Sequence, residues 1–300
     1  MSRILEALRR AETERETRDG VAAEEHAGPF KISALPELLG ATQRQFPATP
    51  QFPPLTYHDN QEHFRTGNLN PDSHVAAERF RQLRYRLEAW RARQPDGRLL
   101  ITSAVPGEGK TLVATNLAES LAAASARVLL IDADMRRPGV GPSLGLDPLP
   151  GLCEILRGEL NWREGCRRLE PLGYDYLAAG VATDNAPELL HGGALQALMT
   201  EVAAAFDWVV IDSAPLAPFA DSLYLASVIR GILLVARERV TPADVFQKVV
   251  NSLREFPLIG IVLNAVQRQQ RDSYYYAYYY GERGADSKPE PLAEVGNGDD

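Results

Sequence analysis

The chain has few of the residues that build disulfide frameworks or metal cages. Its 300 residues include two cysteines, Cys153 and Cys166, and five histidines, none of them at the spacing of metal ligands. Two isolated cysteines fit a reducing compartment and are expected to be packing residues. The sequence therefore excludes a small disulfide-stapled scaffold and gives no sign of a zinc site.

Long apolar runs are also missing. No stretch approaches the ~20 apolar residues that a membrane-spanning helix requires, and no signal peptide opens the chain. The net charge of −8 disfavours nucleic acid as a general partner. We therefore expect a cytoplasmic protein that does not bind nucleic acid.

A glycine-containing loop stands between a predicted strand and a predicted helix. The apolar run Leu99–Ile101 leads into the stretch SAVPGEGKT, residues 103–111, and a helical pattern begins at Leu112. In this order glycines let backbone amides approach phosphates, a lysine reaches the β- and γ-phosphates, and a threonine hydroxyl ligates Mg²⁺. The full pattern has glycine where this chain has Ala104, so the loop is a variant. The predicted ATP-contacting residues are Pro106, Gly107, Glu108, Gly109, Lys110, Thr111 and Leu112.

Two acidic motifs follow, each at the end of an apolar run. Asp132 and Asp134 follow the run VLLI, and Asp212 follows the run WVVI. Because parallel strands end at one edge of an open sheet, we expect these carboxylates beside the loop, although an aspartate also caps turns. We predict that Thr111, Asp132 and Asp212 hold Mg²⁺ and that the three aspartates and Lys110 are catalytic.

Phosphoryl transfer explains this set of residues, because it needs cations and positioning rather than a covalent protein intermediate. Asp132 is predicted to orient or deprotonate an attacking hydroxyl, and Asp134 to support the metal or the nucleotide. Arg136 and Arg137 either balance phosphate charge or form local surface salt bridges.

Residues 97–266 alternate apolar strand patterns with helical ones. This alternation predicts a P-loop NTPase-like α/β domain, a mostly parallel sheet flanked by helices on both faces. The expected strands are Leu99–Ser103, Val128–Asp132, Tyr176–Ala179, Trp208–Ile211, Gly231–Ala236 and Ile259–Asn264. The expected helices are Ala76–Trp90, Leu112–Ala124, Gly151–Arg157, Ala194–Phe206, Ala220–Ile229 and Pro242–Glu255.

Three regions of different character are expected along the chain: 1–70, 71–266 and 267–300. The first has a short amphipathic helix starting at Ser2, followed by a mostly disordered, proline-rich linker. That helix docks a membrane adaptor, lies on lipid or has no function, and its glutamates disfavour lipid. The second is the P-loop domain, and the third is a flexible tyrosine-rich tail.

The motifs together resemble those of the bacterial tyrosine kinases of capsule and exopolysaccharide synthesis, over about residues 75–280. Residues 103–111 are similar to the Walker A motif of that family, residues 129–136 to its A′ motif, and residues 209–215 to its Walker B motif. One departure is Ala214, where the family usually has proline. The resemblance implies an ATP- and Mg²⁺-dependent protein-tyrosine kinase.

Two further stretches resemble this family and imply specific roles. Glu78, Arg81 and Arg84 match its Glu-x-x-Arg-x-x-Arg pattern, which implies a contact between subunits; the alternative is a solvated helix face. Six of the eleven tyrosines lie within seven residues of the tail, and the resemblance implies autophosphorylation there rather than an aggregation-prone segment. These tyrosines are Tyr274, Tyr275, Tyr276, Tyr278, Tyr279 and Tyr280.

The resemblance also implies partners. The chain is expected to form a ring-like homo-oligomer that phosphorylates its tails in trans, with charge on the tails loosening the ring. A separate transmembrane polysaccharide co-polymerase would activate it and recruit it to the inner face of the membrane, and a cognate phosphotyrosine phosphatase would reset it.

Two other functions share this architecture. Partition and division-site ATPases act as nucleotide-gated dimer switches, but they carry an extra lysine where this chain has Val105. A weakly catalytic ATP-binding scaffold of the polysaccharide machinery has no sequence feature that separates it from an active kinase. The tyrosine-rich tail favours the kinase over the switch.

Overall fold

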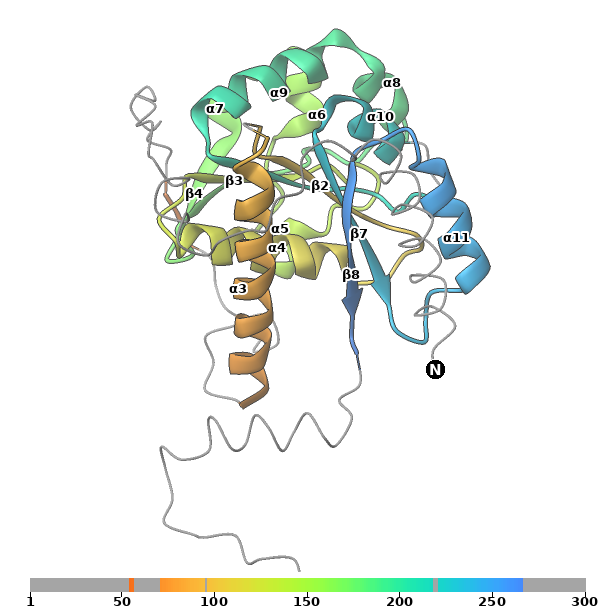
Figure 1. Ribbon diagram of the computed structural model, residues 1–300. Coiled ribbons are helices and arrows are strands. Elements are labelled where there is room, and N and C mark those ends of the chain that lie inside the picture. The colour runs from red at the N-terminus through yellow and green to blue at the C-terminus, as the bar shows by residue number, and fades with distance from the viewer. Residues whose placement is uncertain (1–53, 57–70, 95, 218–220, 267–300) are drawn as a thin grey trace, which may run out of the picture. The chain divides into compact units, whose positions relative to one another are not determined.

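The computed structural model describes residues 54–56, 71–94, 96–217 and 221–266 (Figure 1). The chain divides after Asn264 into two units, and the helices and strands described all belong to the first. The predicted N-terminal helix, most of the predicted linker and the tyrosine-rich tail lie outside the described residues.

The strands form one sheet. Their bounds are β1 (Pro54–Thr56), β2 (Arg98–Ser103), β3 (Val128–Asp132), β4 (Cys166–Glu170), β5 (Tyr174–Leu177), β6 (Trp208–Asp212), β7 (Gly231–Arg237) and β8 (Leu258–Asn264). In the described residues they lie in the order β1-β4-β5-β3-β6-β2-β7-β8. The β4–β5 pair is antiparallel and every other pair is parallel. The predicted mostly parallel sheet is confirmed.

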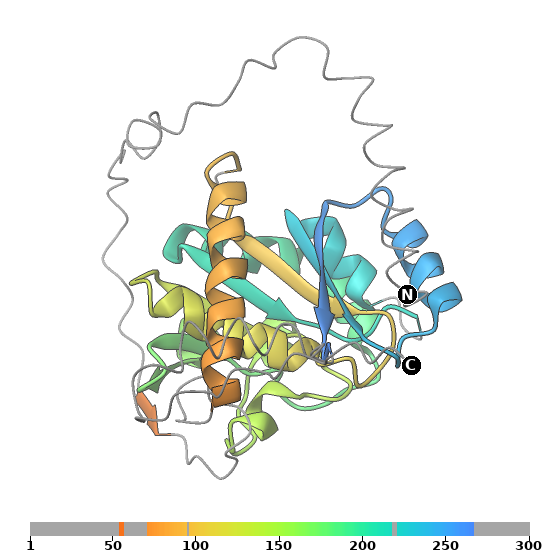
Figure 2. The same cartoon turned by 60° about the horizontal axis from the view of Figure 1, so that its bottom comes forward.

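Helices cover both faces of this sheet (Figures 1 and 2). Their bounds are α3 (Pro71–Arg91), α4 (Lys110–Ala122), α5 (Val140–Ser143), α6 (Leu152–Leu156), α7 (Trp162–Gly165), α8 (Ala186–His191), α9 (Gly193–Ala205), α10 (Asp221–Val228) and α11 (Ala243–Ser252). One core cluster joins α3, α4 and α5 to the sheet, and a second joins α6 to α11 to it. In the described part of the chain, no helix combines the length and apolar character that a membrane crossing requires.

The central strands are buried along their whole length. Leu99 and Ile101 on β2 belong to the α3–α4 side of the core, whereas Leu100 between them belongs to the α6–α11 side. A strand covered on both faces needs apolar residues at consecutive positions. This explains why β2, β3 and β6 were predicted from unbroken apolar runs.

Strands β4 and β1 and helices α5, α7 and α8 were not predicted, whereas the short α6 was expected within Gly151–Arg157. β4 has the sequence CRRLE, whose charges hide its strand character. Its partner β5 covers Tyr174–Leu177, two residues earlier than the predicted strand Tyr176–Ala179. β1 pairs in parallel with β4, within a segment for which only a linker was expected. Helices α5, α7 and α8 have four to six residues, too few for a helical repeat to be recognised.

Gly97 lies at a close approach between β2 and the segment that leads into β6. A Cβ atom at this position would stand 2.1 Å from the carbonyl oxygen of Asp207. We expect Gly97→Ala to lower the free energy of unfolding by about 1–3 kcal/mol through overpacking, measured by urea denaturation. Gly193→Ala is the control, because the described residues leave a Cβ there without neighbours within 4 Å. Equal stability of the two variants would contradict this account.

Candidate active site

The loop between β2 and α4 contains two glycines with left-handed backbone and leads directly into a helix N-terminus. Gly107 and Gly109 have φ angles of 82° and 91°, in the left-handed region that glycine adopts without strain. Gly109 is the N-cap of α4, so the loop amides stand at a helix N-terminus, where anions bind favourably. Pro106 and Gly107 are exposed and Leu112 is half-buried.

Lys110 lies among carboxylates at the start of α4. Its Nζ is 3.2 Å from Oδ2 of Asp134, and both side chains are largely buried. Burial alone would lower the pKa of Lys110, but Asp212, Asp134 and Asp132 outweigh it and raise that pKa. The lysine therefore carries its charge at the place where the predicted phosphates would lie.

Thr111 and Asp212 meet directly. The Thr111 hydroxyl donates a hydrogen bond of 2.6 Å to Oδ2 of Asp212. The other oxygen, Oδ1, is buried and has no hydrogen-bond partner among the residues that the structure describes. A hydroxyl and a carboxylate with an unused oxygen are suitable donors for Mg²⁺, so these two residues fit the predicted metal site.

Asp132 is held by backbone amides. Its Oδ2 accepts hydrogen bonds from the amides of Gly139 and Val140, at 3.0 and 2.9 Å, and Oδ1 accepts one from Asp134 at 3.1 Å. Asp132 and Asp212 are register partners on β3 and β6. The structure thus brings Lys110 and the three predicted aspartates together at one edge of the sheet.

Two neighbouring buried carboxylates cannot both ionise easily. Burial and the Asp212 carboxylate raise the pKa of Asp132 to about 8. Burial also raises the pKa of Asp212, to about 6, although Lys110 and the Thr111 hydroxyl act in the opposite direction. Asp132 is therefore the member of the pair that keeps a proton near neutral pH.

The side chain of Glu108 points into the protein and away from the predicted nucleotide. Its carboxylate is buried and accepts hydrogen bonds from the amide of Val105, at 2.8 Å, and from the hydroxyl of Thr241. Its own carbonyl oxygen accepts a 2.9 Å bond from the side chain of Asn264. The carboxylate therefore ties the loop to Thr241, beyond the end of β7, and the carbonyl ties it to the end of β8. That Glu108 contacts the nucleotide stays a prediction.

Thr241 tests this structural role of Glu108. We expect Thr241→Val to destabilise the fold by about 1–3 kcal/mol, because a buried carboxylate loses a hydrogen-bond donor. The nucleotide affinity should fall as well, since the loop loses its anchor. Urea denaturation and nucleotide titration measure both effects. Thr200→Val is the matched control, because its hydroxyl bonds to the Gln196 carbonyl on an exposed face of α9; a similar loss in both variants would refute the anchoring role.

The two arginines of the A′ segment are used locally. Arg136 contacts Asp221 at the start of α10, with Nε 2.6 Å from Oδ2, and lies 3.7 Å from Asp184. The amide of Arg137 donates to Asp134 at 3.0 Å. Of the two interpretations left open, the structure supports the local salt bridge for Arg136.

The predicted subunit-contact residues on α3 are divided between two surroundings. Glu78 and Arg81 form an ion pair of 3.0 Å, and Arg81 is about half exposed. Arg84 instead donates to the carbonyl of Ser120 on α4, at 2.8 Å, and lies 3.5 Å from Glu88. The charged edge predicted to be free for a partner is therefore engaged within the chain at Arg84.

Sequence reasoning overlooked several residues around the loop. The side chain of Arg237 donates to the carbonyl of Gly107 at 3.1 Å, and Asn264 stands so close to Gly109 that a Cβ there would be 2.1 Å from it. Both are polar residues at the ends of apolar strands, the same signal that identified Asp132 and Asp212. Asp221 had no comparable signal.

The comparisons with known proteins agree with this geometry. The model of the CobQ/CobB/MinD/ParA nucleotide binding domain matches residues 99–283, more than half of the chain. The tyrosine-protein kinase YwqD of Bacillus subtilis is 31% identical over 202 residues, which cover 67% of this chain and 85% of YwqD. The chain belongs to the bacterial tyrosine kinase family. The match to the nucleotide binding domain model is less specific than the match to YwqD, because that model also describes MinD and ParA.

Two further matches show which part of longer relatives and of a solved kinase domain this chain covers. The succinoglycan biosynthesis transport protein ExoP of Rhizobium meliloti is 34% identical over 203 residues, 66% of this chain but 26% of ExoP. The kinase domain of Escherichia coli tyrosine kinase ETK has a TM-score of 0.63 and 28% identity, covering 70% of this chain and 85% of that domain. The chain therefore spans about a quarter to a third of the longer relatives.

Proposed function

We propose that this chain is an ATP-dependent protein-tyrosine kinase that phosphorylates the tyrosine cluster 274–280 of another copy of itself. The observation that carries the proposal is the convergence of Lys110, the Thr111–Asp212 pair and Asp132 beside a phosphate-binding loop at one sheet edge. The family membership supports the same conclusion, since relatives along most of the domain are named tyrosine-protein kinases.

The residues divide the work of phosphoryl transfer among them. The loop amides and the Lys110 ammonium would hold the β- and γ-phosphates. Thr111 and Asp212 would hold Mg²⁺, which when bound neutralises charge on the phosphate oxygens. Asp132, fixed by three amides, would act in its ionised form, which the positive charges of Lys110 and of a bound Mg²⁺ would favour. In that form it would accept the phenol proton as the tyrosine oxygen attacks the γ-phosphorus and the bond to the β-phosphate oxygen breaks, releasing ADP.

The polysaccharide context is the remaining part of the proposal. A relative of the chain is named a succinoglycan biosynthesis transport protein, which supports a role in exopolysaccharide chain length and export. We propose that the kinase forms a homo-oligomer through the half-buried Glu78 and the exposed Arg81 and works with a membrane adaptor and a phosphatase. The adaptor would hold the protein at the inner face of the membrane.

A mixing experiment tests transfer between copies. Full-length Lys110→Met protein, as acceptor, is incubated with Mg²⁺, ATP and a donor truncated after residue 266, and phosphotyrosine is then mapped. We expect label on the acceptor's residues 274–280, and none when a truncated Lys110→Met donor is used. A wild-type full-length chain that labels itself while the mixture stays unlabelled would overturn trans transfer and keep the kinase.

A further inference from the structure

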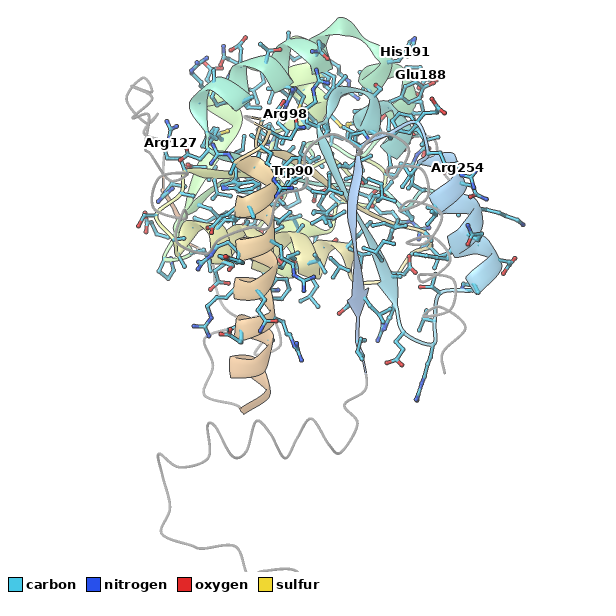
Figure 3. All side chains as sticks on the ribbon, viewed as in Figure 1. Trp90, Arg98, Arg127, Glu188, His191 and Arg254 are labelled. Atoms are coloured by element: carbon cyan, nitrogen blue, oxygen red, sulfur yellow. The ribbon has the colours of Figure 1, made fainter. Side chains whose placement is uncertain are left out.

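A cavity of about 690 Å³ lies at the edge of the sheet opposite the phosphate loop. It is bounded by the end of α3, the end of α10 and the segment between α11 and β8. Strands β7 and β8 begin beside it, and parallel strands end at the other edge, where the phosphate loop lies. Figure 3 labels Trp90 and Arg254, two of its lining residues, at this end of the molecule. The cavity is therefore separate from the nucleotide site.

The floor of the cavity is apolar and aromatic. Trp90 packs against the start of β7, where a Cβ added to Gly231 would stand 2.8 Å from its ring. Phe256 and Ile259, both half-buried, complete this lining. A planar ring of another molecule would find here the stacked or edge-on partners that aromatic groups prefer.

The rim of the cavity is cationic. Arg230 and Arg254 are both exposed residues of the lining, and Glu255 is its single acidic residue. Arg230 also interacts with the carboxylate of Asp96, just outside the lining, and Arg254 has a contact within the chain. Gln94 and Ser227 add neutral polar groups. Arginine presents a planar fork of donors that matches phosphate oxygens in a bidentate manner. The rim thus suits a compact anion held above an aromatic floor.

We propose that this cavity binds a phosphotyrosyl residue, supplied by the phosphorylated segment 274–280 of a second copy of this chain. The proposal rests on the proposed function, because the kinase reaction makes this group. A phosphotyrosine combines a ring for Trp90 and Phe256 with a dianion for Arg230 and Arg254. An unmodified tyrosine lacks the charge and a phosphoserine lacks the ring.

The position of the cavity gives this binding a consequence. A tail that has been phosphorylated leaves the neighbour's nucleotide site and is held at the opposite sheet edge, where it does not block ATP. The volume lies within the range of ordinary ligand pockets, about 300–1,000 Å³.

A peptide-binding experiment tests the proposal without any kinase reaction. A synthetic peptide of residues 272–282 with phosphotyrosine at 276 is titrated against the full-length Lys110→Met chain by fluorescence anisotropy. The same peptide is titrated unmodified, and again with phosphoserine in place of Tyr276. We expect the phosphotyrosine peptide to bind at least about tenfold more tightly than either.

Paired variants identify the site. Arg230→Gln with Arg254→Gln should weaken phosphotyrosine-peptide binding at least about tenfold. Arg157→Gln with Arg163→Gln removes the same charge from side chains near α6 and α7 and should change it less than about twofold. Unchanged melting of each variant shows that it folds. Equal weakening by both pairs, no weakening by either, or equal affinity for phosphoserine and phosphotyrosine peptides would overturn the proposal, whereas a failure of the kinase would appear only in the mixing experiment.

Discussion

Lys110→Met is expected to reduce phosphate transfer to the tail by at least about 100-fold. In the described residues, this ammonium is the side-chain cation that lies among Asp132, Asp134 and Asp212. Without it, no positive side chain among these described residues would stabilise the negative charge that develops on the transferred phosphoryl group. Transfer from γ-labelled ATP to protein tyrosine is the measurement. Lys248→Met is the matched control, because this lysine is exposed on α11 and pairs with Asp244 at 4.0 Å.

The stability of the Lys110→Met variant is expected to depend on pH more strongly than that of the wild type. Without the ammonium, the buried carboxylates lose their counter-charge and remain protonated to higher pH. We expect the variant to melt near the wild-type temperature at pH 6 and below it at pH 8. A variant that transfers phosphate at the rate of Lys248→Met would contradict the assignment of the site.

Asp132→Asn is expected to stabilise the protein at pH 8 while it abolishes activity. The pKa of Asp132 is about 8 in the folded chain and about 3.9 in an unfolded one. Between these values the folded chain holds a proton that the unfolded chain has lost, so wild-type stability falls as the pH rises from about 4 to 8. Asparagine cannot ionise, so the free energy of unfolding of the variant should not show this fall between pH 4 and pH 8.

The size of this effect follows from the shift. Each unit of pKa corresponds to about 1.4 kcal/mol, so the wild-type chain should lose a few kcal/mol of stability between pH 4 and pH 8, and the variant should not. Near pH 4 the variant should be the less stable of the two, because the asparagine NH2 cannot accept the amide bonds that Asp132 accepts through both oxygens. Urea denaturation at several pH values, without nucleotide, measures it. Asp244→Asn, on an exposed face of α11, should follow the wild-type curve. Parallel curves for Asp132→Asn and wild type would show that Asp132 ionises normally.

Much of the site was predictable because its residues are carried by strand ends. An apolar run fixes a strand, and in a parallel sheet the residue that follows it must lie at the carboxyl edge, so Asp132 and Asp212 became register partners. The loop glycines were predictable for a different local reason, because the turn requires positive φ angles that glycine adopts without strain. Local rules were sufficient for both.

The remaining features depend on contacts between distant segments. The sequence around Glu108 does not say that its carboxylate meets Thr241, 133 residues away. Arg136 pairs with Asp221, 85 residues along the chain, and Arg84 reaches a carbonyl on α4. Each of these side chains had a plausible exposed role, and the tertiary packing decided otherwise. Strand β4 was missed because its sequence CRRLE is partly exposed and charged and lacks the unbroken apolar run of the central strands.

The most direct test of the site is to follow the γ-phosphate of ATP. The purified full-length chain is incubated with γ-labelled ATP and Mg²⁺, and the label is divided into inorganic phosphate and protein-bound phosphate, the latter mapped by residue. The account predicts Mg²⁺-dependent label on tyrosines within 274–280. Label recovered entirely as inorganic phosphate, with none on tyrosine, would contradict it and would identify an ATPase instead.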